Sequence, residues 1–311
     1  MEKNQRWNEI SAQELKKWLE QGRDVTVIDP FPLQQYEQQH IPGAKNVCVY
    51  QVSFPQDLKE VVPDLQQEVV IYSATDLTRE GTTAAEKMER MGYQNITLLK
   101  GGLASWVGAG YPMEGKEPMR KEDEGPIFAM KDALYHVDTG MSVIEWAGRN
   151  PNGKHQGTLK LSKGQLTVKG GEVGGSFEID MTSIKNRDLE GDALQPILVA
   201  HLLSDDFFFV KMFPKASFTI QSAQVVDEPT LSSPNFSVLG VFEMLGIRRE
   251  IQFLATVNST EDGGISAEAH FDIDRTQWNV IYGSSRFFRH LGMHLVYDLI
   301  SLDLRIVARP G

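Results

Sequence analysis

The spacing of apolar residues changes partway along the chain, and this change restricts the fold to two domains of different class. Over the first part, short apolar runs such as 69–72 alternate with stretches of helical spacing such as 83–91. Ser11 and Glu14 form a capping-box pattern that predicts the start of an earlier helix. Strands that alternate with helices favour a parallel α/β sheet with flanking helices.

After residue 126, apolar residues recur at every second position, as they do along 177–181 and 300–306. Seven or eight such segments follow one another, with a turn expected at Lys163 and Gly164 and one short helix at 196–203. A period of two predicts antiparallel strands that form a sandwich or a barrel.

Residues 113–126 separate the two patterns, because they are charged and show no apolar period. We therefore expect an α/β domain at 1–112, a linker at 113–126 and a β domain at 127–311.

The composition excludes several classes of protein. The chain of 311 residues has one cysteine, which leaves no internal disulfide and no thiolate-rich metal site. Its net charge of −11 is a poor match for nucleic acid or for an anionic membrane. No apolar run reaches the roughly 18 residues of a membrane helix, and the first residues lack the apolar core of a secretory signal. We therefore expect a cytoplasmic protein with no membrane span and no nucleic-acid partner.

Three features of the first domain form a specific set. They are Asp29 after a strand, the run His-Ile-Pro-Gly-Ala at 40–44, and Lys-Gly-Gly-Leu-Ala-Ser-Trp at 100–106. Together they resemble a rhodanese-like domain over residues 8–112. The resemblance implies an α/β domain whose active members carry a cysteine on a loop that leads into a helix. Loop N–H groups and the helix dipole would stabilise the thiolate and an anionic substrate there.

The nucleophile position of this resemblance holds Ser73. A serine forms no persulfide, and its hydroxyl is a poor nucleophile without a neighbouring base. Asp76 would repel an anionic substrate, and Arg79 stands six residues after Ser73, which is closer to the phosphatase-like spacing than to the sulfurtransferase spacing. Phe31 stands where the active pattern usually has arginine. We therefore expect no catalytic residue in the loop of Ser73, Asp76 and Arg79, and we interpret the domain as an inactive module for interaction or regulation.

Cys48 is the alternative nucleophile for sulfur transfer. It lies between Val47 and Val49 on an expected strand at 46–50. A small residue in that position is typical of a buried core, where a thiol is inert.

Four runs of the second domain form another specific set. They are Tyr-His-Val-Asp at 135–138, Gly-Ser-Phe-Glu-Ile-Asp at 175–180, His-Leu-Leu-Ser-Asp-Asp-Phe-Phe-Phe at 201–209, and Asp-Arg-Thr-Gln-Trp at 274–278. They resemble the YceI-like family over residues 133–309. The resemblance implies a lipocalin-like β-barrel around an isoprenoid quinone, a prenyl lipid or another amphiphile, with no other cofactor.

Large apolar residues on the expected strands are our candidates for the ligand-binding wall. An eight-stranded barrel is just wide enough for packed side chains or for one slender ligand, so the same residues could also fill a solid core. The candidates are Trp146, Phe177, Ile179, Phe218, Phe242 and Trp278.

The polar residues of the second domain suggest no further site. His290 and His294 stand four apart, but no third ligand accompanies them, so we predict no metal. Asp205 and Asp206 precede three phenylalanines, where N-capping or solvent exposure is expected. His201 lies on the short apolar helix, which is typical of a structural histidine.

Three functions follow from these features. The first is a carrier of an isoprenoid-type or amphiphilic lipid, with the first domain docking a protein partner or stabilising the barrel. The second is an atypical sulfurtransferase or phosphatase-like enzyme with a substrate bound in the barrel. The third is a scaffold without ligand. We favour the carrier, and exposed apolar positions leave a homodimer open.

Overall fold

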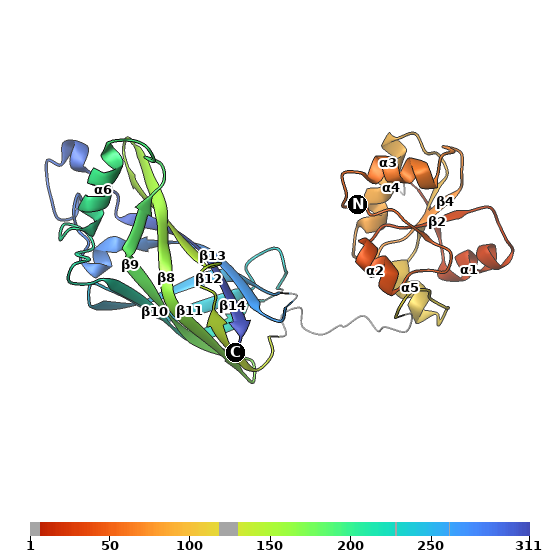
Figure 1. Ribbon diagram of the computed structural model, residues 1–311. Coiled ribbons are helices and arrows are strands. Elements are labelled where there is room, and N and C mark those ends of the chain that lie inside the picture. The colour runs from red at the N-terminus through yellow and green to blue at the C-terminus, as the bar shows by residue number, and fades with distance from the viewer. Residues whose placement is uncertain (1–6, 118–129, 228, 261) are drawn as a thin grey trace. The chain divides into compact units, whose positions relative to one another are not determined.

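The chain forms two compact units, one within residues 1–123 and the other within 124–311 (Figure 1). The computed structural model describes residues 7–117, 130–227, 229–260 and 262–311. The expected linker at 113–126 lies largely outside these residues, so the predicted domain limits of 1–112 and 127–311 stay a prediction.

The first unit is a parallel sheet with helices on both faces, as expected. Its strands are β1 (Asn8–Ile10), β2 (Thr26–Asp29), β3 (Lys45–Asn46), β4 (Val69–Ile71) and β5 (Ile96–Leu99), in the order β1-β5-β4-β2-β3. Its helices are α1 (Ala12–Glu20), α2 (Leu33–Gln38), α3 (Phe54–Val61), α4 (Glu80–Arg90) and α5 (Gly102–Gly108).

Side chains alternate across this sheet and form two separate cores. Val69 and Ile71 of β4 pack on the face that α3 and α4 cover, whereas Val70 packs on the face of α1 and α5. Because both faces are buried, these strands read as continuous apolar runs.

The predicted start of α1 is confirmed, and the predicted strand at 46–50 is wrong. The Ser11 hydroxyl accepts from the Glu14 N–H (3.2 Å), and the Glu14 carboxylate accepts from the Ser11 N–H (3.1 Å). The strand β3 ends at Asn46, so Cys48 lies beyond it in irregular backbone. Cys48 is nevertheless buried, and Val47 and Val49 on either side of it belong to the core.

The second unit is a closed antiparallel barrel, which confirms the expected class. Its strands are β6 (Ala133–Val137), β7 (Val143–Asn150), β8 (Gly153–Lys169), β9 (Glu172–Asn186), β10 (Lys215–Val225), β11 (Phe236–Met244), β12 (Ile247–Ser259), β13 (Ile265–Asp274) and β14 (Leu299–Pro310). Neighbouring strands pair in sequence from β8 to β14, and β7 closes the ring because it pairs with both β14 and β8. β6 occupies the same position in the barrel as β7, between β8 and β14, because it pairs with other residues of these two strands.

The expected turn at Lys163 and Gly164 is wrong. β8 runs through both residues without reversing, and its pairing with β9 shifts register between Leu161 and Lys163. A β-bulge therefore absorbs the irregular position, and one long strand replaces the two that we expected.

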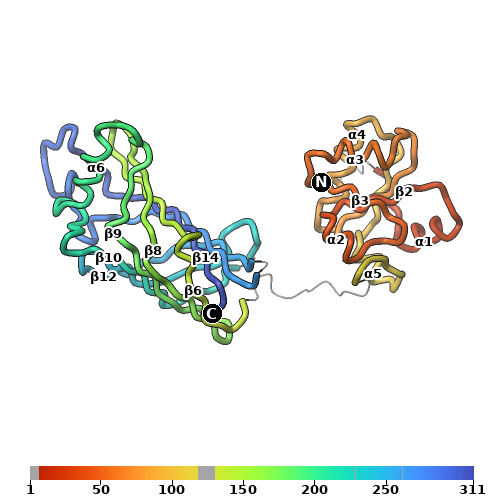
Figure 2. The backbone as a smooth tube through the Cα atoms, viewed as in Figure 1, coloured from red at the N-terminus to blue at the C-terminus, as the bar shows by residue number. Residues whose placement is uncertain are grey.

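Short helices and the loops around them cover one end of the barrel. They include α6 (Leu194–Leu203) and the short 3₁₀ helices η1 (Arg275–Trp278) and η2 (Gly292–His294). Figure 2 shows α6 at the end of the barrel that lies away from the C-terminus. The predicted helix at 196–203 is confirmed with a start two residues earlier.

Candidate functional site

The barrel encloses a cavity of about 260 Å³. Strands β7 to β14 all contribute side chains to its wall, and Leu198, Leu202 and Phe207 close it from the side of α6. The wall is almost entirely apolar. Because apolar surface of this kind keeps water out and accepts apolar ligands, the cavity suits a hydrocarbon chain.

Aromatic rings form one side of this cavity. Phe253 and Phe271 stack with their centroids 4.2 Å apart, and Phe218 lies 5.6 Å from Phe253. Phe218 of β10 and Phe253 of β12 contact each other across the intervening strand β11, at the position of Gly240. A Cβ at Gly240 would lie 2.4 Å from the Phe218 ring, so only glycine leaves room for this contact.

Five of our six candidates line the cavity. They are Trp146, Phe177, Ile179, Phe218 and Phe242. Trp278 does not, because its indole N–H donates to the backbone oxygen of Phe242 (3.1 Å) and its ring packs edge-on against the Phe242 ring. Trp278 is a buried core residue at the end of η1, and the ligand-binding role of the other five remains a prediction.

The candidates missed several wall residues. Phe253 and Phe271 stand at inward positions of the period-two pattern, so that pattern could have identified them. Phe207 and Phe208 also line the cavity, but they lie in irregular backbone after α6 and no period marks them.

One residue of the cavity lining has a buried polar atom without a partner. The polar members of the lining are Trp146, Arg149, Asn150, His155, Glu268 and Arg275. All except Trp146 bond to other groups of the protein, as Arg149 does to the Ser301 hydroxyl (2.7 Å). The Nε1 of Trp146 is the one buried side-chain nitrogen without a hydrogen-bond partner among the described residues of the barrel unit. A buried donor of this kind is expected to bind an acceptor.

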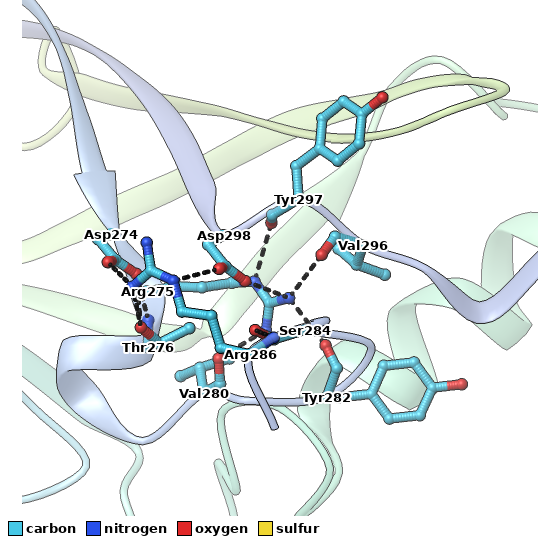
Figure 3. A network of polar contacts seen from close by, with 10 residues as sticks. All are labelled: Asp274, Arg275, Thr276, Val280, Tyr282, Ser284, Arg286, Val296, Tyr297 and Asp298. Atoms are coloured by element: carbon cyan, nitrogen blue, oxygen red, sulfur yellow. Dashed lines mark hydrogen bonds and ion pairs between the residues drawn. The ribbon is translucent and has the colours of Figure 1, made fainter. Parts of the chain in front are cut away.

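A buried arginine fastens the loop over this end of the barrel (Figure 3). Arg275 is 1% exposed, and its guanidinium donates to four backbone oxygens. These oxygens belong to Val280 (2.5 Å), Tyr282 (2.8 Å), Val296 (3.1 Å) and Tyr297 (3.1 Å).

Two further groups complete this network. Burial lowers the pKa of Arg275, and the carboxylate of Asp298 at 3.8 Å opposes the shift. Asp298 also pairs with Arg286 at 3.0 Å. The arginine thus ties both arms of the loop 280–298 to the barrel, a role that the sequence analysis missed.

The loop at the expected rhodanese nucleophile bonds to itself. The Ser73 hydroxyl accepts from the Gly81 N–H (3.0 Å), and the Thr78 hydroxyl accepts from the Thr75 N–H (3.1 Å). The Glu80 carboxylate lies 3.4 Å from the Ala74 N–H. Side chains of the chain therefore occupy N–H groups that an anionic substrate would need.

Asp76 and Arg79 bond to residues outside this set. Asp76 accepts from the Gly101 N–H (2.5 Å), which ties the loop to the start of α5. Arg79 is 76% exposed and pairs with Glu86 at 3.5 Å. Neither side chain bonds to Ser73.

Asp29 at the end of β2 is a structural group. Its carboxylate is fully buried and accepts from the Tyr72 hydroxyl (2.5 Å) and from the Phe31 N–H (2.9 Å). Burial raises the pKa of Asp29, and these hydrogen bonds partly offset the rise. The Phe31 ring is buried and lies 5.8 Å from the ring of Tyr72, whose hydroxyl bonds to Asp29.

His201 and His294 both contact Tyr282, but their ring nitrogens bond to different groups. His294 bonds to the Tyr282 hydroxyl (3.1 Å), and His201 lies 3.2 Å from the Asp206 carboxylate. His290 stands before η2 on left-handed backbone (φ 57°), so no single helix aligns it with His294. Within the part of the chain that the structure describes, no three His, Cys, Asp or Glu residues gather as a metal site.

Family models match both units. A model of the YceI-like domain matches residues 135–308, and a model of the rhodanese-like domain matches residues 11–109. None of the described helices is long and apolar enough to cross a bilayer.

Solved structures resemble each unit. A polyisoprenoid binding domain from Saccharophagus degradans is 12% identical, covers 58% of this chain and 99% of its own, and has a TM-score of 0.44. The rhodanese-like domain of the Anabaena sp. protein Alr3790 is 25% identical, covers 40% of this chain and 90% of its own, and has a TM-score of 0.32.

A curated relative matches part of the chain. The Bacillus subtilis protein named "Putative sulfur carrier protein YrkF" is 23% identical over 100 residues, which are 32% of this chain and 51% of that protein. The chain therefore spans about half the length of this relative.

Proposed function

This chain belongs to the YceI-like family, and we propose that its barrel binds and carries an isoprenoid-type or other amphiphilic lipid. The observation that carries the proposal is the apolar cavity, and one of its lining residues, Trp146, has a buried indole N–H without a hydrogen-bond partner. Such a site fits a molecule with a long apolar part and at least one hydrogen-bond acceptor.

The apolar wall favours a hydrocarbon chain. Transfer of apolar groups from water gains about 0.8 kcal/mol per buried CH₂, so each isoprene unit would contribute about 4 kcal/mol. The rings of Phe218, Phe253 and Phe271 offer flat contact area for such a chain.

Trp146 supports an acceptor on the ligand. A buried N–H without a partner costs about 1–3 kcal/mol, and a carbonyl or hydroxyl oxygen of the ligand would remove that cost. Prenyl quinones and prenyl alcohols both carry such an oxygen.

The rhodanese-like domain acts, in this proposal, as an inactive module that docks a protein partner. Ser73 cannot carry sulfur, and Thr78 and Glu80 already bond to the loop. The exposed apolar residues Val52 and Leu77 leave this domain with surface that a partner could cover.

Thermal unfolding with added ligand tests the proposal. Ligand at about 100 times its Kd stabilises the folded state by about 2.7 kcal/mol, and each kcal/mol raises the Tm of a unit of this size by roughly 2–4 °C. We expect farnesol or a short-chain prenyl quinone to raise the Tm of the barrel. If neither compound changes the Tm at concentrations up to its solubility, the hypothesis of a scaffold without ligand is favoured instead.

A further inference from the structure

Two segments, residues 194–213 and 279–298, cover one end of the barrel, and we name them together the cap. They contact each other, because the His201 ring packs edge-on against the Tyr282 ring with centroids 4.6 Å apart. The Tyr282 hydroxyl also bonds to His294 (3.1 Å). Figure 1 shows α6 and the loop around η2 at the same end of the barrel.

The inner side of the cap belongs to the cavity. Leu198, Leu202, Phe207, Phe208 and Val296 all line it. A ligand that enters or leaves the barrel past the cap would therefore displace apolar side chains.

The outer side of the cap is also apolar. Leu194 is 58% exposed, Ile197 63%, Phe287 54% and Met293 85%. A helix on the surface of a water-soluble protein usually keeps one polar side, whereas α6 has apolar residues all around. Apolar side chains gathered at one place on a surface indicate a site of contact.

The charge of the cap loop differs from that of the chain. Residues 285–295 contain Arg286, Arg289, His290 and His294 and no acidic residue, although the whole chain carries −11. Arg286 is neutralised by Asp274 and Asp298, so Arg289 is the cation of this loop that no described carboxylate pairs.

The other segment of the cap carries carboxylates. Asp205 and Asp206 are exposed there beside one exposed lysine, Lys211, and Asp206 pairs with His201. The loop around Phe287 is therefore the basic part of the cap, and the turn after α6 is its acidic part.

We propose that the cap docks on a lipid bilayer with anionic headgroups. Exposed Phe, Leu, Ile and Met side chains would enter the interface, and Arg289 would contact the phosphates. The attraction is local, because charges further than about 8 Å away are screened at physiological salt. The purpose of docking rests on the proposed function: a lipid insoluble in water would pass between the bilayer and the cavity at this end.

Vesicle sedimentation with the full chain tests this proposal. We expect the chain to sediment with vesicles of equimolar phosphatidylcholine and phosphatidylglycerol, and less with phosphatidylcholine alone. The double variant Phe287→Ser/Met293→Ser should lower the partition coefficient about tenfold or more, since it removes two apolar side chains from the interface. Arg289→Gln should lower binding to the anionic vesicles about fivefold and leave binding to the neutral ones unchanged.

A matched variant on the barrel wall serves as control. Val225→Ser/Leu254→Ser removes exposed apolar area of similar size from β10 and β12, far from the cap along these strands. It should bind vesicles as the unmodified chain does. Melting curves of both double variants establish that each is folded.

Two outcomes would overturn the proposal. One is that the chain sediments no more with vesicles than without them. This outcome includes the case where the cap forms a dimer, which the variant Phe287→Ser/Met293→Ser would dissociate. The other is an equal loss in the cap and wall variants. Extraction of bound lipid separates the two hypotheses, because a lipid-loaded chain that ignores vesicles contradicts docking alone. An empty chain that binds vesicles contradicts the carrier function alone.

Discussion

Replacing Trp146 by phenylalanine should affect the empty protein and the loaded protein in opposite ways. The indole N–H has no partner in the cavity wall, and a buried donor in that state costs about 1–3 kcal/mol. Phenylalanine removes this cost but gives up about two carbons of apolar contact, worth about 1.6 kcal/mol. The two effects are of similar size, so the stability of the empty protein should change by no more than about 1.5 kcal/mol.

Trp278 provides the matched control for this substitution. Its indole N–H donates to the Phe242 oxygen, and it lies outside the cavity lining. Trp278→Phe loses the same apolar contact and also a satisfied hydrogen bond, so we expect a cost of about 2–3 kcal/mol. Urea unfolding of both variants without ligand measures the contrast.

Ligand binding should reverse the ranking. Trp146→Phe loses a hydrogen bond of about 0.5–1.5 kcal/mol to a prenyl alcohol or quinone, which weakens the affinity roughly two- to twelvefold. An isoprenoid hydrocarbon without a polar head should bind both proteins equally. The reasoning fails if Trp146→Phe weakens the binding of hydrocarbon and alcohol to the same extent, or if it destabilises the empty protein as much as Trp278→Phe does.

Three further predictions concern other parts of the chain. Arg275→Met should cost about 3–5 kcal/mol in urea unfolding, because it strips four backbone oxygens of their donor; a loss under 1 kcal/mol would show that the loop needs no such tie. The ammonium of Lys215 and neighbouring groups lower the pKa of Glu178 to about 2. Its contribution is therefore complete above the unfolded pKa and is lost as the pH falls through 2, so Glu178→Gln should cost about 1 kcal/mol at pH 7 and nothing near pH 2. Equal costs at both pH values would contradict this. Ser73→Cys should stay at background in a cyanide–thiosulfate assay, since Asp76 and the self-bonded loop remain; robust turnover would show that the anion site is intact.

The fold could be predicted from two patterns of apolar residues in the sequence. Strands with alternating apolar residues gave the barrel because each inward side chain meets the same core, and β14 is the clearest case. The continuous apolar run of β4 marked a strand that is buried on both faces. The turn at Lys163 and Gly164 was wrong because a bulge and a turn use the same residue types.

The cavity was harder to predict from the sequence. The same alternation describes a filled barrel and a hollow one, so no pattern could decide that about 260 Å³ stays open. Trp278 was chosen for its size, yet it lies in the 3₁₀ helix η1, where its N–H bonds to the Phe242 oxygen and its ring packs against the Phe242 ring. Arg275 lies in the run 274–278 that resembles the YceI-like family, but its role could not be predicted, because its partners are backbone oxygens that any sequence supplies.

Mass spectrometry of an organic extract from freshly purified protein tests the central claim most directly. The account predicts one prenyl quinone, prenyl alcohol or similar amphiphile in stoichiometric amount, retained by the unmodified chain and depleted in Trp146→Phe. An extract without lipid, from protein whose Tm also ignores added farnesol and prenyl quinone, would contradict the account.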